Sequence, residues 1–269
     1  MIPAAFEYVR AGSVEDAVEL LGRDEDAKLL AGGHSLIPLL RLRFVRPPLL
    51  VDIGRLDDLR YVREKGDRIA IGALSRHAEL VRDPLLAQAC PMLAQAASGV
   101  GDPQVRHRGT IGGSVAHADP ASDLGTILLA LDADLVARGP SGERVLPAAD
   151  CFTGPFATSL EQREMLIEIR VPRVDQGTYL KYVRSARDWA TVGVAAARVD
   201  GRVHVGLANM GATPLRARAV EQAVADGASP ADAAAHASDG TDPPSDVSAS
   251  GEYRAHLAQV LVRRALEQL

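Results

Sequence analysis

The sequence predicts an α+β protein with two domains. Its 269 residues suit one large or two modest domains, and 47% hydrophobic with 24% charged residues is enough for packed cores. Strand-like and helical segments are mixed in the first part without one repeated unit, whereas strands and then helices follow one another in the last part. Because the character of the sequence changes around residues 172–177, we place the domains at 1–175 and 176–269.

The first domain is expected to open with a helix, a strand and a second helix. Ser13 has the side chain of a helix N-cap, and apolar residues at helical spacing follow it. Residues 28–31 form an apolar run that ends at Gly32-Gly33, the pattern of a strand that enters a turn. A short helix over residues 36–43 is expected next, since Pro38 is tolerated in a first turn.

Further strands and helices are expected through the rest of this domain. The predicted strands are residues 49–53, 68–72, 134–137, 144–146 and 165–171. The predicted helices begin at Ser75, cover 84–98 and cover 122–131. No G-x-G-x-x-G motif follows any of these strands, so a Rossmann dinucleotide site is not supported.

The second domain is expected to be a small α+β unit that combines a three-stranded antiparallel sheet with helices. The predicted strands are residues 178–184, 191–199 and 203–210. The Asp200-Gly201 pair between the last two is a strong hairpin signal. A helix over 214–225, a loop or loosely helical stretch over 226–251 and a final helix over 252–269 complete the prediction.

The bulk properties exclude several classes of protein. A net charge of −5 argues against broad affinity for nucleic acid, which needs a basic surface. No signal peptide and no run of about 18 apolar residues is visible, so we expect a cytoplasmic protein without a transmembrane segment. The two cysteines, Cys90 and Cys151, cannot supply the four thiolates of an iron–sulfur cluster, and we expect them to be free thiols.

The first segment that can carry chemistry is the glycine pair at 32–33. Two glycines between a strand and a helix allow positive φ angles and let backbone N–H groups turn toward one point. Such a nest before a helix suits an anion such as a pyrophosphate, and Ser35 adds a hydroxyl. An ordinary Gly-Gly turn is the alternative.

The second such segment spans residues 108–123. It contains three glycines with the hydroxyls of Thr110 and Ser114, and then two carboxylates at the start of a helix, so it offers N–H donors for phosphate and acceptors for sugar hydroxyls. Asp123 could bind such a hydroxyl, or it could simply carry first-turn charge at the helix N-terminus. His117 and Asp119 lack a third ligand at a recognised spacing, so no metal site is predicted.

Together the two segments resemble the FAD-binding medium subunit of molybdenum hydroxylases, in particular the medium chain of aerobic carbon monoxide dehydrogenase and its relatives. The resemblance rests on A-G-G-H-S-L-I-P-L-L-R-L-R at residues 31–43 and R-G-T-I-G-G-S-V-A-H-A-D-P-A-S-D at 108–123. It continues at residues 6–8, 51–53, 71–79, 164–167 and 179–182.

The resemblance implies the two-subdomain FAD-binding fold of the vanillyl-alcohol-oxidase/PCMH type, with a smaller C-terminal domain. It implies that Gly32 to Ser35 hold the pyrophosphate. No metal ligand and no catalytic side chain is predicted in this chain. The residues implied to bind FAD are Leu29, Leu30, Ala31, Gly32, Gly33, His34, Ser35, Leu36, Thr110, Ile111, Gly112, Gly113, Ser114, Asp123, Leu166, Lys181 and Trp189.

Three of these side chains have alternative interpretations. Lys181 suits the anionic reduced flavin and its phosphates, but it could be a solvated strand lysine. Trp189, the single tryptophan, could cover one face of the flavin or could be a buried anchor of the C-terminal domain. His34 occupies a position that is linked covalently to flavin in more distant proteins of this fold; the resemblance favours noncovalent FAD.

The resemblance also implies an electron-transfer subunit. A large partner subunit would carry the molybdopterin cofactor and a small one two 2Fe-2S clusters, in a dimer of heterotrimers, with NAD or a quinone as electron acceptor. One alternative is a self-sufficient FAD-dependent oxidase or reductase, for which His34, His117 and Asp119 are the candidate bases. The other is a scaffold protein that no longer binds FAD.

Overall fold

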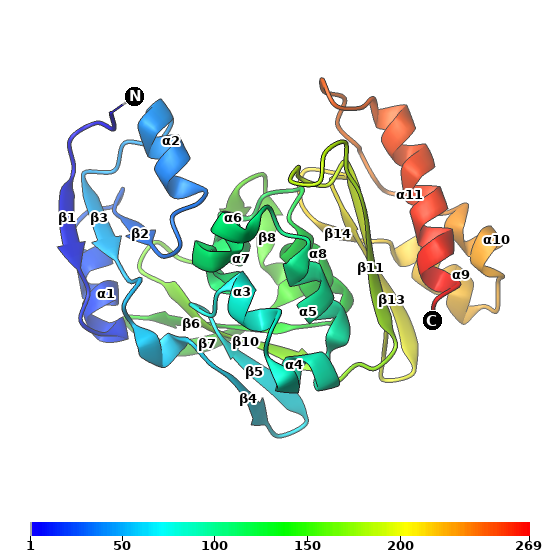
Figure 1. Cartoon of the computed structure of the whole chain (residues 1–269), viewed down its shortest axis with the longest axis horizontal. Helices are drawn as coiled ribbons and strands as arrows, with labels where there is room; N and C mark the ends of the chain where they lie inside the picture. Colours follow the sequence, from blue (N-terminus) through cyan, green and yellow to red (C-terminus); the bar gives the residue numbers. More distant parts are fainter. Residues whose placement is uncertain (1) are drawn as a thin grey trace.

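Residues 2–269 are described by a computed structural model, in which sheets alternate with layers of helices (Figure 1). A small sheet near the N-terminus is followed by a five-stranded sheet, a helical layer, a four-stranded sheet and a final helical layer. This arrangement is the α+β architecture that the sequence predicts. None of the helices within residues 2–269 has both the length and the apolar character needed to cross a membrane.

The N-terminal end forms a three-stranded parallel sheet in the order β1-β3-β2. Its strands are β1 (Glu7–Arg10), β2 (Lys28–Leu30) and β3 (Leu49–Asp52). Helix α1 (Val14–Leu21) packs on this sheet and begins, as predicted, at Ser13, whose hydroxyl accepts a hydrogen bond from the amide of Asp16. Helix α2 (Leu36–Leu42) is also confirmed, whereas β1, with mostly exposed side chains, was not foreseen.

The centre of the molecule is a five-stranded antiparallel sheet in the order β4-β5-β10-β6-β7. Its strands are β4 (Val62–Lys65), β5 (Arg68–Gly72), β6 (Asp134–Gly139), β7 (Gly142–Pro147) and β10 (Met165–Pro172). All but β4 were predicted; β4 consists largely of exposed charged residues and so lacks the apolar signal of a strand. The smaller elements nearby are β8 (Phe152–Gly154), β9 (Ala157–Thr158) and the 3₁₀ turns η1 (Asp57–Leu59) and η2 (Ala148–Asp150).

Six short helices lie between the five-stranded and the four-stranded sheet. They are α3 (His77–Leu80), α4 (Pro84–Ala89), α5 (Pro91–Ser98), α6 (Pro103–Arg108), α7 (Ile111–His117) and α8 (Asp123–Ala130). The main hydrophobic core joins their apolar faces to both sheets. These helices therefore form the rigid interior against which the functional segments lie.

Three predictions for this layer need correction. The single helix over 84–98 is wrong, because Pro91 lacks the N–H that would continue the helix, and α5 begins anew there. The helix predicted from Ser75 begins at His77 and has only four residues. The second glycine segment is not a loop: Gly112 and Gly113 lie in the first turn of α7, and α6 precedes it.

The C-terminal part contains a four-stranded antiparallel sheet in the order β11-β12-β13-β14. Its strands are β11 (Gly177–Tyr182), β12 (Val192–Val199), β13 (Arg202–Ala208) and β14 (Leu215–Arg216). The predicted hairpin is confirmed, with Asp200 at φ 49° and Gly201 at φ 77° in the turn. Three strands were expected; residues 215–216 add a fourth, so the helix predicted from residue 214 begins only at Arg218.

The last helices cover the outer face of this sheet. They are α9 (Arg218–Ala225), α10 (Pro230–Ala234) and α11 (Gly251–Leu266). Alternate residues of β12 enter two different cores, since Val192, Val194 and Ala196 face these helices while Ala195 and Ala197 face the central layer. The sheet is thus buried on both faces: β11 runs beside α5, and β12 and β13 lie against α8 (Figure 1).

Candidate functional site

A cavity of about 440 Å³ lies where the N-terminal sheet, the central helices and β11 meet. It is lined by every predicted cofactor residue except Leu30 and Ile111. Those that line it are Leu29, Ala31, Gly32, Gly33, His34, Ser35, Leu36, Thr110, Gly112, Gly113, Ser114, Asp123, Leu166, Lys181 and Trp189. Ile111 is fully buried in the central core, and Leu30 lies at the end of β2. The fold therefore gathers four distant stretches of sequence around one space.

The first glycine segment presents free backbone amides. Gly33 has a φ of 80°, which reverses the chain between β2 and α2. Within residues 2–269, no acceptor of the chain itself binds the amides of residues 32–36. Ser35 occupies the N-cap of α2, yet its side chain makes no capping hydrogen bond. Because unpaired amides at such a turn attract negative charge, this segment has the character of an anion-binding nest.

The same segment packs directly on the end of α6. A Cβ atom at Gly32 would overlap the carbonyl oxygen of Arg108. A glycine at this position therefore allows the two backbones to touch. The contact fixes the distance between the first glycine segment and the start of α7.

The second glycine segment differs, because its amides already have partners. Ile111 donates to the carbonyl oxygen of Ser75 at 3.1 Å, and Gly112 to that of Ala73 at 2.8 Å. Gly113 donates to Thr110 Oγ1 at 3.2 Å, and Ser114 to the carbonyl oxygen of Thr110 at 3.0 Å. The expectation that these amides are available to a phosphate is wrong. The segment offers the cavity hydroxyl groups instead.

Gly112 has a packing role in this arrangement. A Cβ atom there would lie 2.6 Å from the Cβ atom and 2.7 Å from the carbonyl oxygen of Ala73. The glycine thus lets the first turn of α7 lie against the residue that follows β5.

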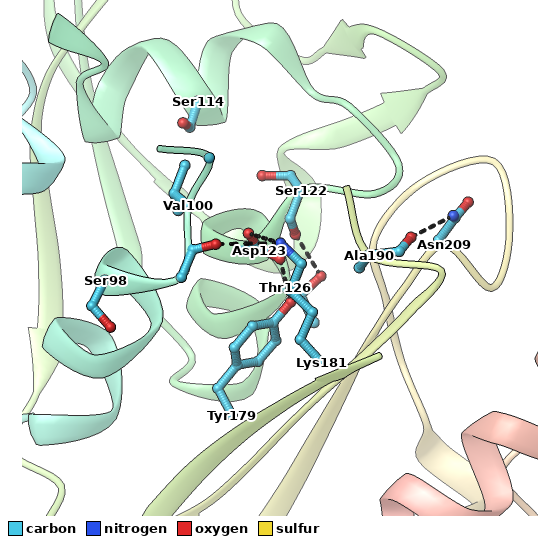
Figure 2. A network of polar contacts seen from close by, with 12 residues as sticks. Ser98, Val100, Ser114, Ser122, Asp123, Thr126, Tyr179, Lys181, Ala190 and Asn209 are labelled. Atoms are coloured by element: carbon cyan, nitrogen blue, oxygen red, sulfur yellow. Dashed lines mark hydrogen bonds and ion pairs between the residues drawn. The ribbon is translucent and has the colours of Figure 1, made fainter. Parts of the chain in front are cut away.

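A buried ion pair between Lys181 and Asp123 forms part of the cavity lining (Figure 2). Lys181 Nζ on β11 lies 2.9 Å from Asp123 Oδ2 on α8, and the hydroxyl of Tyr179 donates to Asp123 Oδ1 at 2.6 Å. Burial raises the pKa of Asp123, while Lys181 and Tyr179 act to lower it. Burial and the neighbouring carboxylate raise the pKa of Tyr179 well above its ordinary value, so it donates as a neutral phenol.

This geometry bears on the alternative interpretations of Lys181 and Asp123. The Lys181 side chain is only 13% exposed, so it is not a solvated strand lysine. Asp123 opens the first turn of α8, but the capping oxygen there is Ser122 Oγ, which accepts from the amide of Gly125. The Asp123 carboxylate instead turns toward Tyr179 and Lys181, at the cavity wall.

Trp189 lies at the rim, in the segment that connects β11 to β12. Its side chain is 70% exposed, so the alternative of a buried anchor is wrong. Its neighbour Arg187 lies 3.9 Å from Asp102 across the rim of the same cavity.

Several lining residues were not predicted to contact the cofactor. They are Lys28, Leu39, Ile53, Ala73, Leu74, His77, Val100, Gly101, Val105, Gly109, Ala116, Ala121, Ser122, Leu124, Arg187 and Asp188. His77 is notable because it is buried and polar; burial, Arg106 and His34 lower its pKa to about 4. Its only sequence signal was its place in the stretch 71–79, which carried the family resemblance but no assigned role. His117 and Asp119, considered as bases, also line the cavity.

The donor set suits a dinucleotide that carries a flavin. Free amides of residues 32–36 can hold a pyrophosphate, and hydroxyls of Thr110 and Ser114 lie nearby in the lining. Apolar side chains such as Leu36, Leu124 and Leu166 offer surfaces for planar rings. Within residues 2–269 no group of three or more His, Cys, Asp or Glu side chains is placed to hold a metal ion.

Comparison with known proteins agrees with this chemistry. Residues 4–174 match the family model of the FAD binding domain in molybdopterin dehydrogenase. The chain belongs to this family. Residues 177–269 match the CO dehydrogenase flavoprotein C-terminal domain. The chain therefore contains an FAD-binding domain and is a flavin subunit of the molybdenum-dependent dehydrogenase family, whose members are oxidoreductases.

Individual relatives cover almost the whole chain. The carbon monoxide dehydrogenase medium chain of Hydrogenophaga pseudoflava is 41% identical over 99% of this chain and 97% of that protein. The xanthine dehydrogenase FAD-binding subunit of Escherichia coli O157:H7 is 31% identical over 97% of this chain and 94% of its own length. A solved structure of carbon monoxide dehydrogenase from Hydrogenophaga pseudoflava, lacking the Mo-pyranopterin moiety, superposes with a TM-score of 0.96 at 41% identity, covering 100% of this chain and 98% of the other.

Proposed function

We propose that this chain holds FAD noncovalently in the 440 Å³ cavity and acts as the electron-transfer subunit of a molybdenum hydroxylase complex. The observation that carries the proposal is that the amides of residues 32–36, which have no acceptor within residues 2–269, line the same cavity as the buried cation of Lys181. When bound, FAD would accept electrons from an iron–sulfur partner and pass them to an external acceptor. The protein supplies position and electrostatics.

Each wall of the cavity has a distinct part in this proposal. The amides of residues 32–36 and the Ser35 hydroxyl would bind the pyrophosphate, and Leu29, Ala31 and Leu36 would pack beside it. Asp123 would accept from a sugar hydroxyl, and Leu166 would contact a ring. Leu30, Ile111 and Gly112 would act through the backbone or through packing, since Leu30 and Ile111 lie outside the lining.

Two further side chains, Lys181 and Trp189, would contact the flavin in different ways. The Lys181 ammonium would stabilise negative charge on the cofactor, because it is held in a site with little solvent. Trp189, exposed at the rim, would cover one face of the ring. His34 is exposed at the first glycine segment, and we propose that it forms no bond to the flavin. Flavin fluorescence that stays with the polypeptide on a denaturing gel would contradict noncovalent binding.

The partners proposed are a large molybdopterin subunit and a small subunit with two 2Fe-2S clusters, assembled as a dimer of heterotrimers (a heterohexamer). NAD or a quinone is the proposed acceptor, and the cytoplasm the proposed compartment. Relatives named as medium chains and complex subunits support a multi-subunit assembly. Cys90 and Cys151 are both buried, and burial raises the pKa of each thiol, so neither is placed to ligate a cluster.

The outer face of α2 is suited to contact a partner. Ile37, Leu42 and Phe44 are exposed there, Phe44 by 76%. Arg41, Arg43 and Arg46 lie among them and form no ion pair within residues 2–269. Arginine beside apolar and aromatic side chains is typical of protein interfaces, and Leu36 and Leu39 on the same helix line the cavity. A docked subunit would thus be separated from the cofactor by about one helix diameter, roughly 10–12 Å.

The division at 1–175 and 176–269 remains part of this proposal. It is supported by the two family matches, which end at residue 174 and begin at residue 177. Lys181 would then come from the smaller domain and close a site that the larger one builds.

Purification of the native complex tests the proposed function. We expect the chain to carry one tightly bound FAD and to co-purify with a molybdopterin subunit and an iron–sulfur subunit, identified by metal analysis and by the visible spectrum of the clusters. A chain that stays alone in a native preparation would contradict the electron-transfer proposal.

A self-sufficient oxidase or reductase is the second candidate, because His117 and Asp119 line the cavity. The isolated chain separates the two functions. Rapid turnover of a small substrate by the chain alone would favour the second candidate, whereas FAD binding with only diaphorase-like activity would favour the first. A preparation that stays colourless with added FAD would indicate a scaffold protein.

A further inference from the structure

His77 lies directly behind the second glycine segment. Its amide donates to the carbonyl oxygen of Gly109 at 3.0 Å, and Ile111 donates to the carbonyl oxygen of Ser75 at 3.1 Å. These bonds flank an isolated antiparallel bridge between Arg76 and Thr110. The bridge joins the start of α3 to the start of α7 and places the imidazole under the cavity wall.

The imidazole is tightly enclosed at this position. His77 is 2% exposed. A Cβ atom at Gly109 would lie 2.8 Å from Cδ2 and 2.9 Å from Nε2 of the ring. Gly109 has an ordinary φ of −57°, so the ring, rather than backbone conformation, requires glycine there. The close approach of the two shows that the imidazole has one fixed place.

The two ring nitrogens of His77 have different surroundings. Nε2 lies 3.4 Å from Ser114 Oγ, and Ser114 lines the cofactor cavity. Nδ1 is buried and has no hydrogen-bond partner within residues 2–269. Burial, together with the positive charge of Arg106 and the nearby His34, lowers the pKa of His77 to about 4, so the ring is neutral at neutral pH.

These surroundings select one tautomer. A neutral imidazole carries one hydrogen, on Nδ1 or on Nε2. A hydrogen on Nδ1 would be a buried donor without an acceptor, which folded proteins avoid more strictly than an unfilled acceptor. The hydrogen therefore resides on Nε2, and the ring donates to Ser114 Oγ. Since that oxygen then accepts from the ring, its own hydrogen must point elsewhere.

We propose that His77 is a positioning residue that donates through Nε2 to Ser114 Oγ and so directs the Ser114 hydroxyl hydrogen into the cavity, toward a phosphate oxygen of FAD. This inference rests on the proposed function of the cavity. It also explains how a segment whose amides at residues 111–114 are all paired contributes to anion binding: it retains the hydroxyls of Thr110 and Ser114 as donors.

A double-mutant cycle on FAD binding tests the proposal. The dissociation constant of FAD is measured by quenching of flavin fluorescence on the apoprotein of the full chain, for the parent, His77→Leu, Ser114→Ala and the double variant. We expect Ser114→Ala to weaken binding about tenfold, the usual effect of losing a hydrogen bond to a charged group. We expect His77→Leu to weaken FAD binding by a similar or smaller factor. The double variant should bind FAD no more weakly than Ser114→Ala does.

Two further variants separate positioning from packing. His77→Gln keeps a nitrogen donor near the place of Nε2 and is expected to bind FAD within about twofold of the parent. His77→Asn has a shorter side chain that cannot reach Ser114, and it should resemble His77→Leu. Melting of each apoprotein, followed by circular dichroism, shows which variants are folded, and the Gln and Asn pair gives a result even if His77→Leu does not fold.

The outcomes distinguish this inference from the proposed function. If the parent binds no FAD, both are wrong. Suppose instead that the parent binds FAD, and that His77→Leu lowers FAD affinity by the same factor in the parent and in Ser114→Ala. In that case the proposed function of the cavity stands, and His77 has only a structural role. Equal binding by His77→Gln and His77→Asn would likewise overturn the positioning role.

Discussion

The two glycine-rich segments have similar sequences, but their glycines have different structural roles. At residues 31–36 the turn needs Gly33 for its φ of 80°, and the amides of residues 32–36 have no acceptor within residues 2–269. At residues 110–114 the backbone is helical, every amide from 111 to 114 is paired within the chain, and Gly112 allows α7 to lie against Ala73. In the proposed function, the first segment would bind an anion and the second would bring hydroxyls close to it.

This comparison shows that a glycine motif alone does not identify a phosphate nest. What matters is whether the amides of the segment have other acceptors. Thr110 decides this for the second segment, because its hydroxyl oxygen and its carbonyl oxygen each accept one of the amides that would otherwise face the cavity. Ser35, at the equivalent place in the first segment, makes no such bond.

The largest effect is expected from Gly32→Ala. The added methyl group must push the first segment away from Arg108, and moving packed backbone costs about 3 kcal/mol or more. We expect the free energy of unfolding of the apoprotein, measured with urea, to fall by this amount, and FAD binding to be lost. Gly154→Ala is a control for the change itself: a Cβ atom there would make only an ordinary contact, 3.8 Å from the Cβ atom of Ala157, and no loss of FAD affinity is expected. Unchanged FAD affinity in Gly32→Ala would show that the two segments need not touch.

Gly112→Ala should mainly affect stability. Its methyl group would overpack against Ala73, which costs about 2 kcal/mol of apoprotein stability in urea unfolding. If the variant is as stable as the parent, α7 is not held in place by this contact, and the two segments are more alike than the structure indicates.

The pH dependence of apoprotein stability tests the neutral His77 under α7. The pKa of His77 is about 4 in the folded chain and about 6.5 when unfolded, so below pH 6.5 the unfolded state binds a proton that the folded state does not. The contribution of the neutral His77 to the free energy of unfolding is therefore fully present above pH 6.5 and is lost as the pH is lowered toward 4. Between pH 7 and pH 5 we expect the free energy of unfolding, measured with urea, to fall by about 1–2 kcal/mol less in His77→Gln than in the parent.

Between pH 7 and pH 5 the comparison with His77→Gln isolates His77, because His117 and His204, whose pKa values burial also lowers, are present in both proteins and their contributions cancel. Glu168, whose hydrogen bonds from Lys65, Tyr61 and Arg170 overcome its burial and lower its pKa to about 2, contributes to acid unfolding only below pH 4.5. Parallel pH curves for the parent and His77→Gln would contradict the assignment of this loss to His77.

The smallest effects should come from the two hydroxyl residues at the helix starts. Thr110→Ala removes a helix cap and is expected to lower apoprotein stability by about 1 kcal/mol. Ser35→Ala removes no capping bond, so the apoprotein should keep its melting temperature while FAD binds several-fold more weakly. Equal losses of stability in the two variants would remove the distinction between the segments.

Local chemistry allowed much of the fold to be predicted. Ser13 marked the start of α1, Asp200-Gly201 marked a hairpin, and apolar runs marked most central strands. Helix α7 was missed because two glycines in its first turn each cost about 1 kcal/mol of helix propensity. Contacts with Ser75 and Ala73, more than 35 residues away in sequence, override that preference and cannot be read locally.

Only part of the candidate site could be predicted from the chemistry of the residues alone. The first segment was interpretable because strand, glycines and helix are adjacent in sequence. Lys181 and Asp123 are 58 residues apart, and nothing local predicts that they meet; the family resemblance implied that each binds FAD, but their ion pair is visible only in the structure. His77 was passed over because the bond to Ser114 that gives it a role spans 37 residues.

The contact between Lys181 and Asp123 has a consequence for how the holoprotein is made. N-terminal segments leave the ribosome first, so both glycine segments can fold before β11 has been synthesised. Until β11 arrives, the carboxylate of Asp123 has neither its phenol nor its ammonium partner, and one wall of the cavity is missing. We therefore expect FAD to bind only after β11 has been synthesised. A chain truncated before β11 should remain an apoprotein without FAD.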